Sequence, residues 1–138
     1  MPLKYHIRPE YNLIILVHIG TIPDDEFINF YKSLYEKDPL LTTMNHLVDL
    51  RQTDSTPRSS SVLSQFAEFM KGRVTETAER PKVAVVAPKD LSFGLARMYE
   101  VFADQVKWDF VVFRDIDAAL AWIGLPEDFI NGLDLDAL

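Results

Sequence analysis

The stretch that decides the fold class is Leu13-Ile14-Ile15-Leu16-Val17-His18-Ile19, residues 13–19. Every side chain in it except that of His18 is apolar, and the run has the length of one strand. A strand that is apolar on both faces is normally buried on both faces, as in the interior of a parallel sheet. We therefore expect residues 13–19 to form a strand inside a sheet.

The segments on either side of this strand predict a hairpin before it and a helix after it. Residues 3–8 predict a short strand, and residues 9–12 predict a turn, because proline fixes φ and asparagine tolerates turn geometry. Residues 20–26 contain a proline and three acidic side chains, which favour the N-terminus of a helix that runs to about Lys37. The apolar face of that helix is formed by Phe27, Tyr31, Leu34 and Tyr35.

The rest of the chain alternates predicted strands with predicted helices. The polar residues 51–61 predict a loop, in which a serine caps the helix that follows. Residues 90–106 predict the longest helix, with an apolar stripe at Leu91, Leu95, Met98, Tyr99 and Phe102. The remaining predicted strands cover residues 46–50, 82–87 and 109–113, and a short helix covers residues 115–122.

The resulting element order is β-β-α-β-α-β-α-β-α. Strands separated by helices predict right-handed crossovers, and hence an α/β fold with a mixed, mostly parallel central sheet, an N-terminal hairpin and about four helices. The chain shows no internal repeat and no interdomain linker, so residues 1–138 are predicted to form a single domain. Residues 125–138 mix acidic and apolar side chains and predict a loosely packed C-terminal tail.

The composition narrows the class of protein. Of the 138 residues, 48% are hydrophobic, which is enough for one core, and the net charge of −7 disfavours nucleic acid and anionic membranes as partners. The absence of cysteine excludes disulfides and thiolate metal sites. No apolar run approaches the roughly 20 residues of a membrane span. We therefore expect a cytoplasmic protein with no integral membrane association and no cofactor.

The element order, together with three short segments, resembles a known family. The segments are Gly20-Thr21-Ile22 before the first helix, residues 47–50 in the second core strand and residues 83–87 in the third. Over roughly residues 3–123 the chain resembles the STAS domain, the fold of the SpoIIAA-like anti-sigma-factor antagonists. This resemblance implies a STAS-like, non-catalytic regulatory module that binds a protein partner.

The resemblance also implies a site of phosphorylation. In the family, a kinase modifies a serine in an Asp-Ser-Ser-Gly segment after the second core strand, and the added charge releases a partner. The comparable segment here is Asp54-Ser55-Thr56-Pro57, so Ser55 and Thr56 are the candidate phosphoacceptors. Thr56 replaces the second serine, and Pro57 stands where the family has glycine, which permits close backbone approach. A turn stabilised by the Asp54 side chain is the alternative explanation of this segment.

The distribution of charge predicts a second kind of site. Residues 51–90 carry seven basic and five acidic side chains and are the only net-positive third of the chain. Their loops follow the carboxyl ends of parallel strands, the edge at which α/β sheets bind ligands. We predict an anion site there, although helix capping and solvation explain the same residues. The candidate anion-binding residues are Arg51, Arg58, Ser59, Ser60, Lys89 and Ser92.

No sequence motif points to catalysis. The nucleophile elbow, the phosphate-binding glycine loop and the dinucleotide fingerprint are all absent. The three histidines lie in or beside predicted strands without metal-ligand spacing, so no metal site and no catalytic residue is predicted. An enzyme is the least favoured of three hypotheses.

Two functional hypotheses remain open, and both allow a homodimer. The first is the regulatory module with a protein partner. The second is a carrier-like module for a small anion or a lipid, which uses the same loop edge or an adjacent apolar groove. A carrier requires a cavity, which we expect among Phe66, Phe69, Phe93 and Tyr99.

Overall fold

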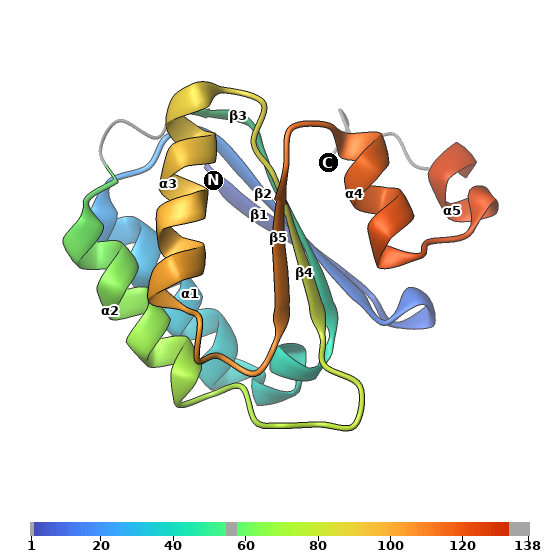
Figure 1. Ribbon diagram of the computed structural model, residues 1–138, viewed down its shortest axis with the longest axis horizontal. Coiled ribbons are helices and arrows are strands. Elements are labelled where there is room, and N and C mark those ends of the chain that lie inside the picture. Colours follow the sequence, from blue (N-terminus) through green and yellow to red (C-terminus); the bar gives the residue numbers. More distant parts are fainter. Residues whose placement is uncertain (1, 55–57, 133–138) are drawn as a thin grey trace.

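The computed structural model describes residues 2–54 and 58–132. Within these residues the chain forms a five-stranded sheet with helices on both faces (Figure 1). The strands are β1 (Leu3–Arg8), β2 (Leu13–Thr21), β3 (Asn45–Asp54), β4 (Lys82–Val86) and β5 (Asp109–Phe113). The α-helices are α1 (Asp24–Lys37), α2 (Ser60–Lys71), α3 (Asp90–Phe102), α4 (Ile116–Ile123) and α5 (Glu127–Gly132). Short 3-10 helices cover Pro9–Tyr11 and Pro39–Thr43.

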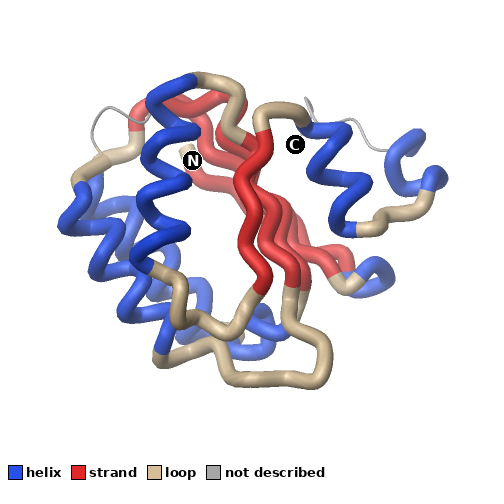
Figure 2. The backbone as a smooth tube through the Cα atoms, in the orientation of Figure 1, coloured by secondary structure: helices blue, strands red, loops and turns tan. Residues whose placement is uncertain are grey.

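The strands lie in the order β1-β2-β3-β4-β5, the same as their order along the chain. β1 pairs antiparallel with β2, and the other neighbours pair parallel, which confirms the predicted mixed sheet with an N-terminal hairpin. Because every parallel crossover steps in the same direction, right-handed connections place α1, α2 and α3 on one face of the sheet. Figure 2 shows these three helices on one side and α4 and α5 on the other.

Strand β2 is buried on both faces, as the sequence predicted. Ile14 and Leu16 belong to the core under α1, α2 and α3, whereas Leu13, Ile15 and Val17 belong to the core under α4 and α5. All five side chains are fully inaccessible to solvent. One strand therefore supplies alternate side chains to two separate hydrophobic cores.

Strand β3 continues beyond its predicted end at residue 50, so the prediction of a loop from residue 51 was wrong for residues 51–54. Pairing with β2 holds these polar residues in the sheet, and Thr53 pairs with Gly20. A bulge accompanies this extension, because the partners of Val17 and Ile19 are Asp49 and Gln52. The extra residue in β3 reverses the alternation of its side chains. Thr53 consequently reaches the face that carries α1, α2 and α3.

Helix α3 turns only part of the predicted stripe, Leu95 and Tyr99, toward the sheet, and it ends at Phe102 instead of Val106. Its buried side chains are Ser92, Ala96 and Tyr99. The predicted stripe was based on large apolar residues, whereas the small side chains of Ser92 and Ala96 form much of the face that lies against the sheet. Three residues of the predicted stripe are exposed, namely Leu91, Met98 and Phe102.

The C-terminal part of the described chain packs on the second face of the sheet. Gly124 adopts a left-handed conformation, with φ of 85°, and ends α4. Within α5, the buried ring of Phe129 lies 4.7 Å from that of Tyr11, measured between ring centroids. Part of the predicted tail, residues 133–138, lies outside the described residues. Among the described helices, none has the length and apolar composition of a membrane span.

The N-terminus of α2 provides a test of the local structure. The hydroxyl of Ser59 accepts a hydrogen bond of 3.2 Å from the backbone N–H of Val62, whereas Ser60 is exposed in the first turn. We expect Ser59→Ala to lower the free energy of unfolding by about 1 kcal/mol, because it removes the cap. Ser60→Ala should change it by no more than about 0.5 kcal/mol. Urea denaturation measures both, and equal losses would contradict the assignment of the cap.

Candidate functional site

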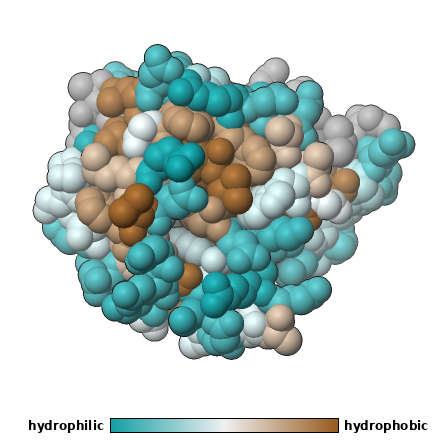
Figure 3. Space-filling view, in the orientation of Figure 1, coloured by the Kyte–Doolittle hydropathy of each residue, from teal (hydrophilic) through white to brown (hydrophobic). Residues whose placement is uncertain are grey.

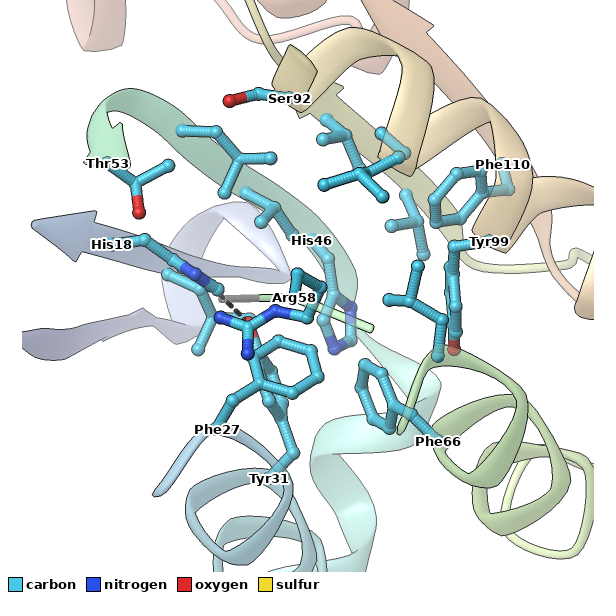
Figure 4. A pocket seen from close by; sticks show the side chains of 18 of the residues that line it. His18, Phe27, Tyr31, His46, Thr53, Arg58, Phe66, Ser92, Tyr99 and Phe110 are labelled. Atoms are coloured by element: carbon cyan, nitrogen blue, oxygen red, sulfur yellow. Dashed lines mark hydrogen bonds between the residues drawn. The ribbon is translucent and has the colours of Figure 1, made fainter. Parts of the chain in front are cut away.

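A cavity of about 100 Å³ lies between the sheet and helices α1, α2 and α3 (Figure 4). Aliphatic side chains of β2, β3 and β4 form its floor, among them Leu16, Val48 and Val85. Aromatic rings from all three helices and from the β5 region form the rest of its wall. These rings are Phe27, Tyr31, Tyr35, Phe66, Tyr99, Trp108 and Phe110.

The aromatic wall is continuous. The ring of Phe66 lies 5.3 Å from that of Phe27, 4.7 Å from that of Tyr31 and 5.1 Å from that of Tyr99, measured between ring centroids. Tyr99 in turn lies 5.5 Å from Phe110. Aromatic pairs at such distances stabilise one another beyond the area that they bury. The cavity therefore has a wall of mutually packed rings.

Two histidine–tyrosine pairs cross from the sheet to α1. Nε2 of His18 lies 2.7 Å from the hydroxyl oxygen of Tyr31. Nε2 of His46 lies 2.8 Å from that of Tyr35, and its Nδ1 lies 2.8 Å from the carbonyl oxygen of Met44. Because a carbonyl only accepts, His46 Nδ1 donates to it, and in the neutral ring Nε2 accepts from the Tyr35 hydroxyl.

Both histidines are neutral near pH 7. Burial, with a smaller contribution from the Arg58 guanidinium, lowers the pKa of His18 to about 3. Burial lowers the pKa of His46 to about 4, although its bond to Met44 opposes the change. These side chains are therefore fixed polar parts of the wall. Neither pKa lies near neutrality, where a general acid or base is most effective.

The hydroxyl of Tyr99 differs from those of Tyr31 and Tyr35. Its oxygen is buried without a hydrogen-bond partner among the described residues. Burial raises the pKa of Tyr99 well above its ordinary value, and the nearby phenol groups of Tyr35 and Tyr31 raise it further. A buried hydroxyl without a partner costs about 1–3 kcal/mol. A polar group that entered the cavity and bonded to Tyr99 would recover that free energy.

Arg58 supplies the positive charge of the cavity. Its Nη1 donates to Oδ1 of Asp24 at 2.9 Å, and its guanidinium carbon lies 3.9 Å from the ring centroid of Phe27. The side chain is only 8% exposed, and this burial lowers the pKa of Arg58 while the bond to Asp24 opposes the change. Burial raises the pKa of Asp24, but hydrogen bonds from Ser59 and Arg58 hold it below its ordinary value. The pair is therefore charged.

The structure brings two of the predicted anion-binding residues to this cavity, Arg58 and Ser92. Arg51 instead holds Asp49, with its Nε and Nη2 donating to the two carboxylate oxygens at 3.0 Å. Lys89 Nζ donates to the carbonyl oxygen of Thr53 at 3.2 Å. Ser59 caps α2, and Ser60 is exposed. The candidate phosphoacceptors Ser55 and Thr56 lie outside the described residues, and the anion site stays a prediction.

The topology of the sheet does not provide the crevice that many α/β sheets have at the carboxyl ends of their strands. Ligand crevices at the carboxyl ends of parallel strands form where the strand order reverses. The order β1-β2-β3-β4-β5 has no such reversal. The cavity lies instead under the helices that cover one face, where Leu16, Val48 and Val85 form its floor.

The cavity overlaps in part with the one expected for a carrier. Phe66 and Tyr99 line it. The ring of Phe69 instead lies 4.8 Å from the guanidinium carbon of Arg73, and that of Phe93 lies 4.0 Å from the guanidinium carbon of Arg114. Among the lining residues that the sequence prediction missed are the two histidine–tyrosine pairs, which are formed by His18, Tyr31, Tyr35 and His46. One feature of the sequence did indicate a polar site, because His18 continues the alternation of Ile14 and Leu16 in an otherwise apolar strand.

The buried histidines predict a pH dependence of stability. Their pKa values of about 3 and about 4 in the folded protein lie below the ordinary 6.5 of an unfolded chain. Their contribution to stability is therefore complete above about pH 6.5 and is lost as the pH falls toward about 4, because only the unfolded chain takes up the protons. At about pH 5 the loss should be roughly 2 kcal/mol for each histidine.

Urea denaturation between about pH 7.5 and about pH 5 measures this dependence. The variant His18→Gln retains a hydrogen-bonding side chain opposite Tyr31 and does not titrate in this range. We expect its stability to decline less with falling pH than that of the wild type. Identical declines in the two proteins would show that His18 is not buried in its neutral form.

Comparison with known proteins identifies the fold. No protein-family model matches the chain, and no curated protein matches it. Among solved structures, it is similar to an uncharacterized protein of the DUF3478 family from Shewanella loihica PV-4, which has a SpoIIAA-like fold. The two share 16% sequence identity with a TM-score of 0.54, and the match covers 88% of this chain and 91% of the other. This chain therefore has a SpoIIAA-like fold, as its sequence resemblance predicted.

Proposed function

We propose that this protein binds a small amphipathic molecule in the aromatic cavity under α1, α2 and α3. The observation that carries this proposal is that Tyr99, a residue of the cavity wall, has a buried hydroxyl without a hydrogen-bond partner among the described residues. Binding sites for small molecules are typically apolar hollows with a few polar groups that orient the ligand. The carrier-like hypothesis from the sequence is thus favoured over the regulatory one.

The size of the cavity limits the ligand. An engineered apolar cavity of about 150 Å³ binds benzene. The cavity here measures about 100 Å³, and it is bordered at one place by the partly exposed Leu95. The buried part of the ligand is accordingly no larger than one small ring or a short chain. Burial of its apolar surface would contribute roughly 25 cal/mol for each Å² removed from water.

The polar groups of the cavity support binding without catalysis. His18 and His46 are each bonded to a tyrosine and are neutral near pH 7. The charge of Arg58 is positioned by Asp24. These groups fit the recognition of a ligand better than proton transfer to it, so we assign the protein no chemical step.

A titration with toluene tests whether the cavity accepts a ring. The chain has two tryptophans, of which Trp108 lines the cavity and Trp122 packs against Phe113 on the opposite face of the sheet. In the variant Trp122→Phe, the emission of Trp108 reports the cavity alone. We expect toluene to change that emission saturably and to raise the melting temperature, because the ligand binds only the folded state. No change up to the solubility limit of toluene would contradict the proposal.

A pair of alanine variants provides the control. Ala96 lines the cavity, whereas Ala67 is buried in the same core but does not line it. Ala96→Leu should fill the cavity, abolish the response to toluene and leave the stability nearly unchanged. Ala67→Leu should lower the free energy of unfolding by about 1–3 kcal/mol, because it overpacks a filled region. Equal losses of unfolding free energy in the two variants would show that the cavity has no room for a larger side chain.

A second candidate function, protein interaction, is favoured by the outer face of α3. Four large apolar side chains are exposed there, and Figure 3 shows apolar surface on this side of the molecule. Exposed apolar patches on soluble domains mark interaction sites more often than chance. The partner that we propose is a second copy of the chain, because two-fold dimers are the commonest assemblies. The residues of this face are Leu91, Met98, Val101 and Phe102.

Light scattering coupled to size-exclusion chromatography tests the dimer. Val101 is 70% exposed on α3, and Leu40 is 73% exposed in the 3-10 helix Pro39–Thr43. We expect a concentration-dependent dimer that Val101→Glu dissociates, because a charge would be buried at the interface. Leu40→Glu adds the same charge elsewhere and should leave the dimer intact. A wild-type protein that stays monomeric at every concentration would exclude this candidate.

A further inference from the structure

The cavity presents polar groups on two sides of an apolar middle. Arg58 lies against Phe27, and Phe66 separates Phe27 from Tyr99, with ring centroids 5.3 Å and 5.1 Å from those two neighbours. Figure 4 shows Arg58 on the side of His18 and Thr53, and Tyr99 on the side of Phe110. A ligand that spans this cavity meets a cation at one side and a phenol at the other.

The side that carries Arg58 fits an anion. A guanidinium has five N–H donors in a planar fork, so it can hold Asp24 and a second carboxylate together. Its side chain is 8% exposed, which strengthens its interaction with an anion relative to that of a surface arginine. The aromatic ring of Phe27, 3.9 Å from the guanidinium carbon, fixes the plane of the fork.

The side that carries Tyr99 fits a hydrogen-bonding group. The hydroxyls of Tyr31 and Tyr35 are already bonded to His18 and His46. The hydroxyl of Tyr99 has no protein partner among the described residues, and the side chain is 6% exposed. A phenol both donates and accepts, so a hydroxyl on the ligand would satisfy it.

We propose that the ligand is a single aromatic ring with a carboxylate at one end and a hydroxyl at the other, of the hydroxyphenyl-acid class. Its carboxylate binds Arg58, its ring lies within the aromatic wall, and its hydroxyl bonds to that of Tyr99. This inference rests on the proposed function and adds the chemical class of the ligand. The wall supports it, because an aromatic ligand can pack edge-to-face or offset-stacked against its rings, which is favourable beyond the area buried.

Four probe ligands separate the contribution of the hydroxyl to binding from that of the carboxylate. They are toluene, 4-methylphenol, phenylacetate and 4-hydroxyphenylacetate. Each is titrated into the Trp122→Phe protein with Trp108 as the reporter. We expect the hydroxyl to tighten binding about 3- to 10-fold, and the carboxylate to tighten it about 10-fold or more, because hydrogen bonds to charged groups are stronger. The affinity should therefore be highest for 4-hydroxyphenylacetate and lowest for toluene.

Two variants assign these gains to their residues. Tyr99→Phe should abolish the gain from the hydroxyl and keep the gain from the carboxylate, and Arg58→Gln should do the reverse. Arg73→Gln is the matched control for the loss of an arginine, because Arg73 pairs with Glu36 away from the cavity. Without ligand, Tyr99→Phe should keep or raise the melting temperature. Tyr35→Phe should lower it, since it leaves the buried His46 without its partner.

The outcomes distinguish the inference from the function on which it rests. If toluene binds but neither polar group tightens binding, the assignment of the ligand class is wrong and the cavity remains a binding site. If both gains persist in Tyr99→Phe and Arg58→Gln, the ligand is oriented by other residues, and the inference is overturned as well. If none of the four compounds binds, the inference and the proposed function fail together.

Discussion

Both hydrophobic cores and the polar wall of the cavity depend on the alternation of side chains along β2. Its even-numbered residues, Ile14 and Leu16, enter the core under α1, α2 and α3, and His18 continues that series to the cavity. Its odd-numbered residues enter the core on the other face. Because a strand has a period of two, a slip of one residue would bury His18 under the wrong helices. The two cores fix the register, and the register fixes the polar wall of the cavity.

The two histidine–tyrosine pairs join α1 to two neighbouring strands of the sheet. His18 stands on β2 and His46 on β3, whereas Tyr31 and Tyr35 stand about one turn apart on α1. His46 lies opposite Ile14, four residues before His18 along β2, so the two pairs are separated along the strands as well as across them. The fold therefore holds these hydroxyls in place, and Tyr99, from α3, has no histidine opposite it.

The sequence predicted those strands and helices that can be recognised from the pattern of their own residues. The strands Leu3–Arg8 and Asp109–Phe113 have the predicted bounds, and Ser59 caps α2. The extension of β3 escaped prediction because pairing with β2 outweighs the polar composition of residues 51–54. The cavity could not be found from the sequence because contacts between residues far apart in the chain form it. Arg58, for example, donates a hydrogen bond to Asp24, 34 residues away, and no local pattern predicts that contact.

The bulge in β3 makes the site tolerant of a change in chain length at one point. Three residue steps of β3, from Asp49 to Gln52, run beside two steps of β2, from Val17 to Ile19. Loss of the codon for Arg51 would restore a regular ladder with Thr53 still opposite Gly20, so Thr53 would stay on the face that carries the cavity. Its bond to the carbonyl oxygen of Gly20 would be kept. A natural variant that lacks Arg51 would lose the ion pair with Asp49 but keep the fold and the lining of the cavity.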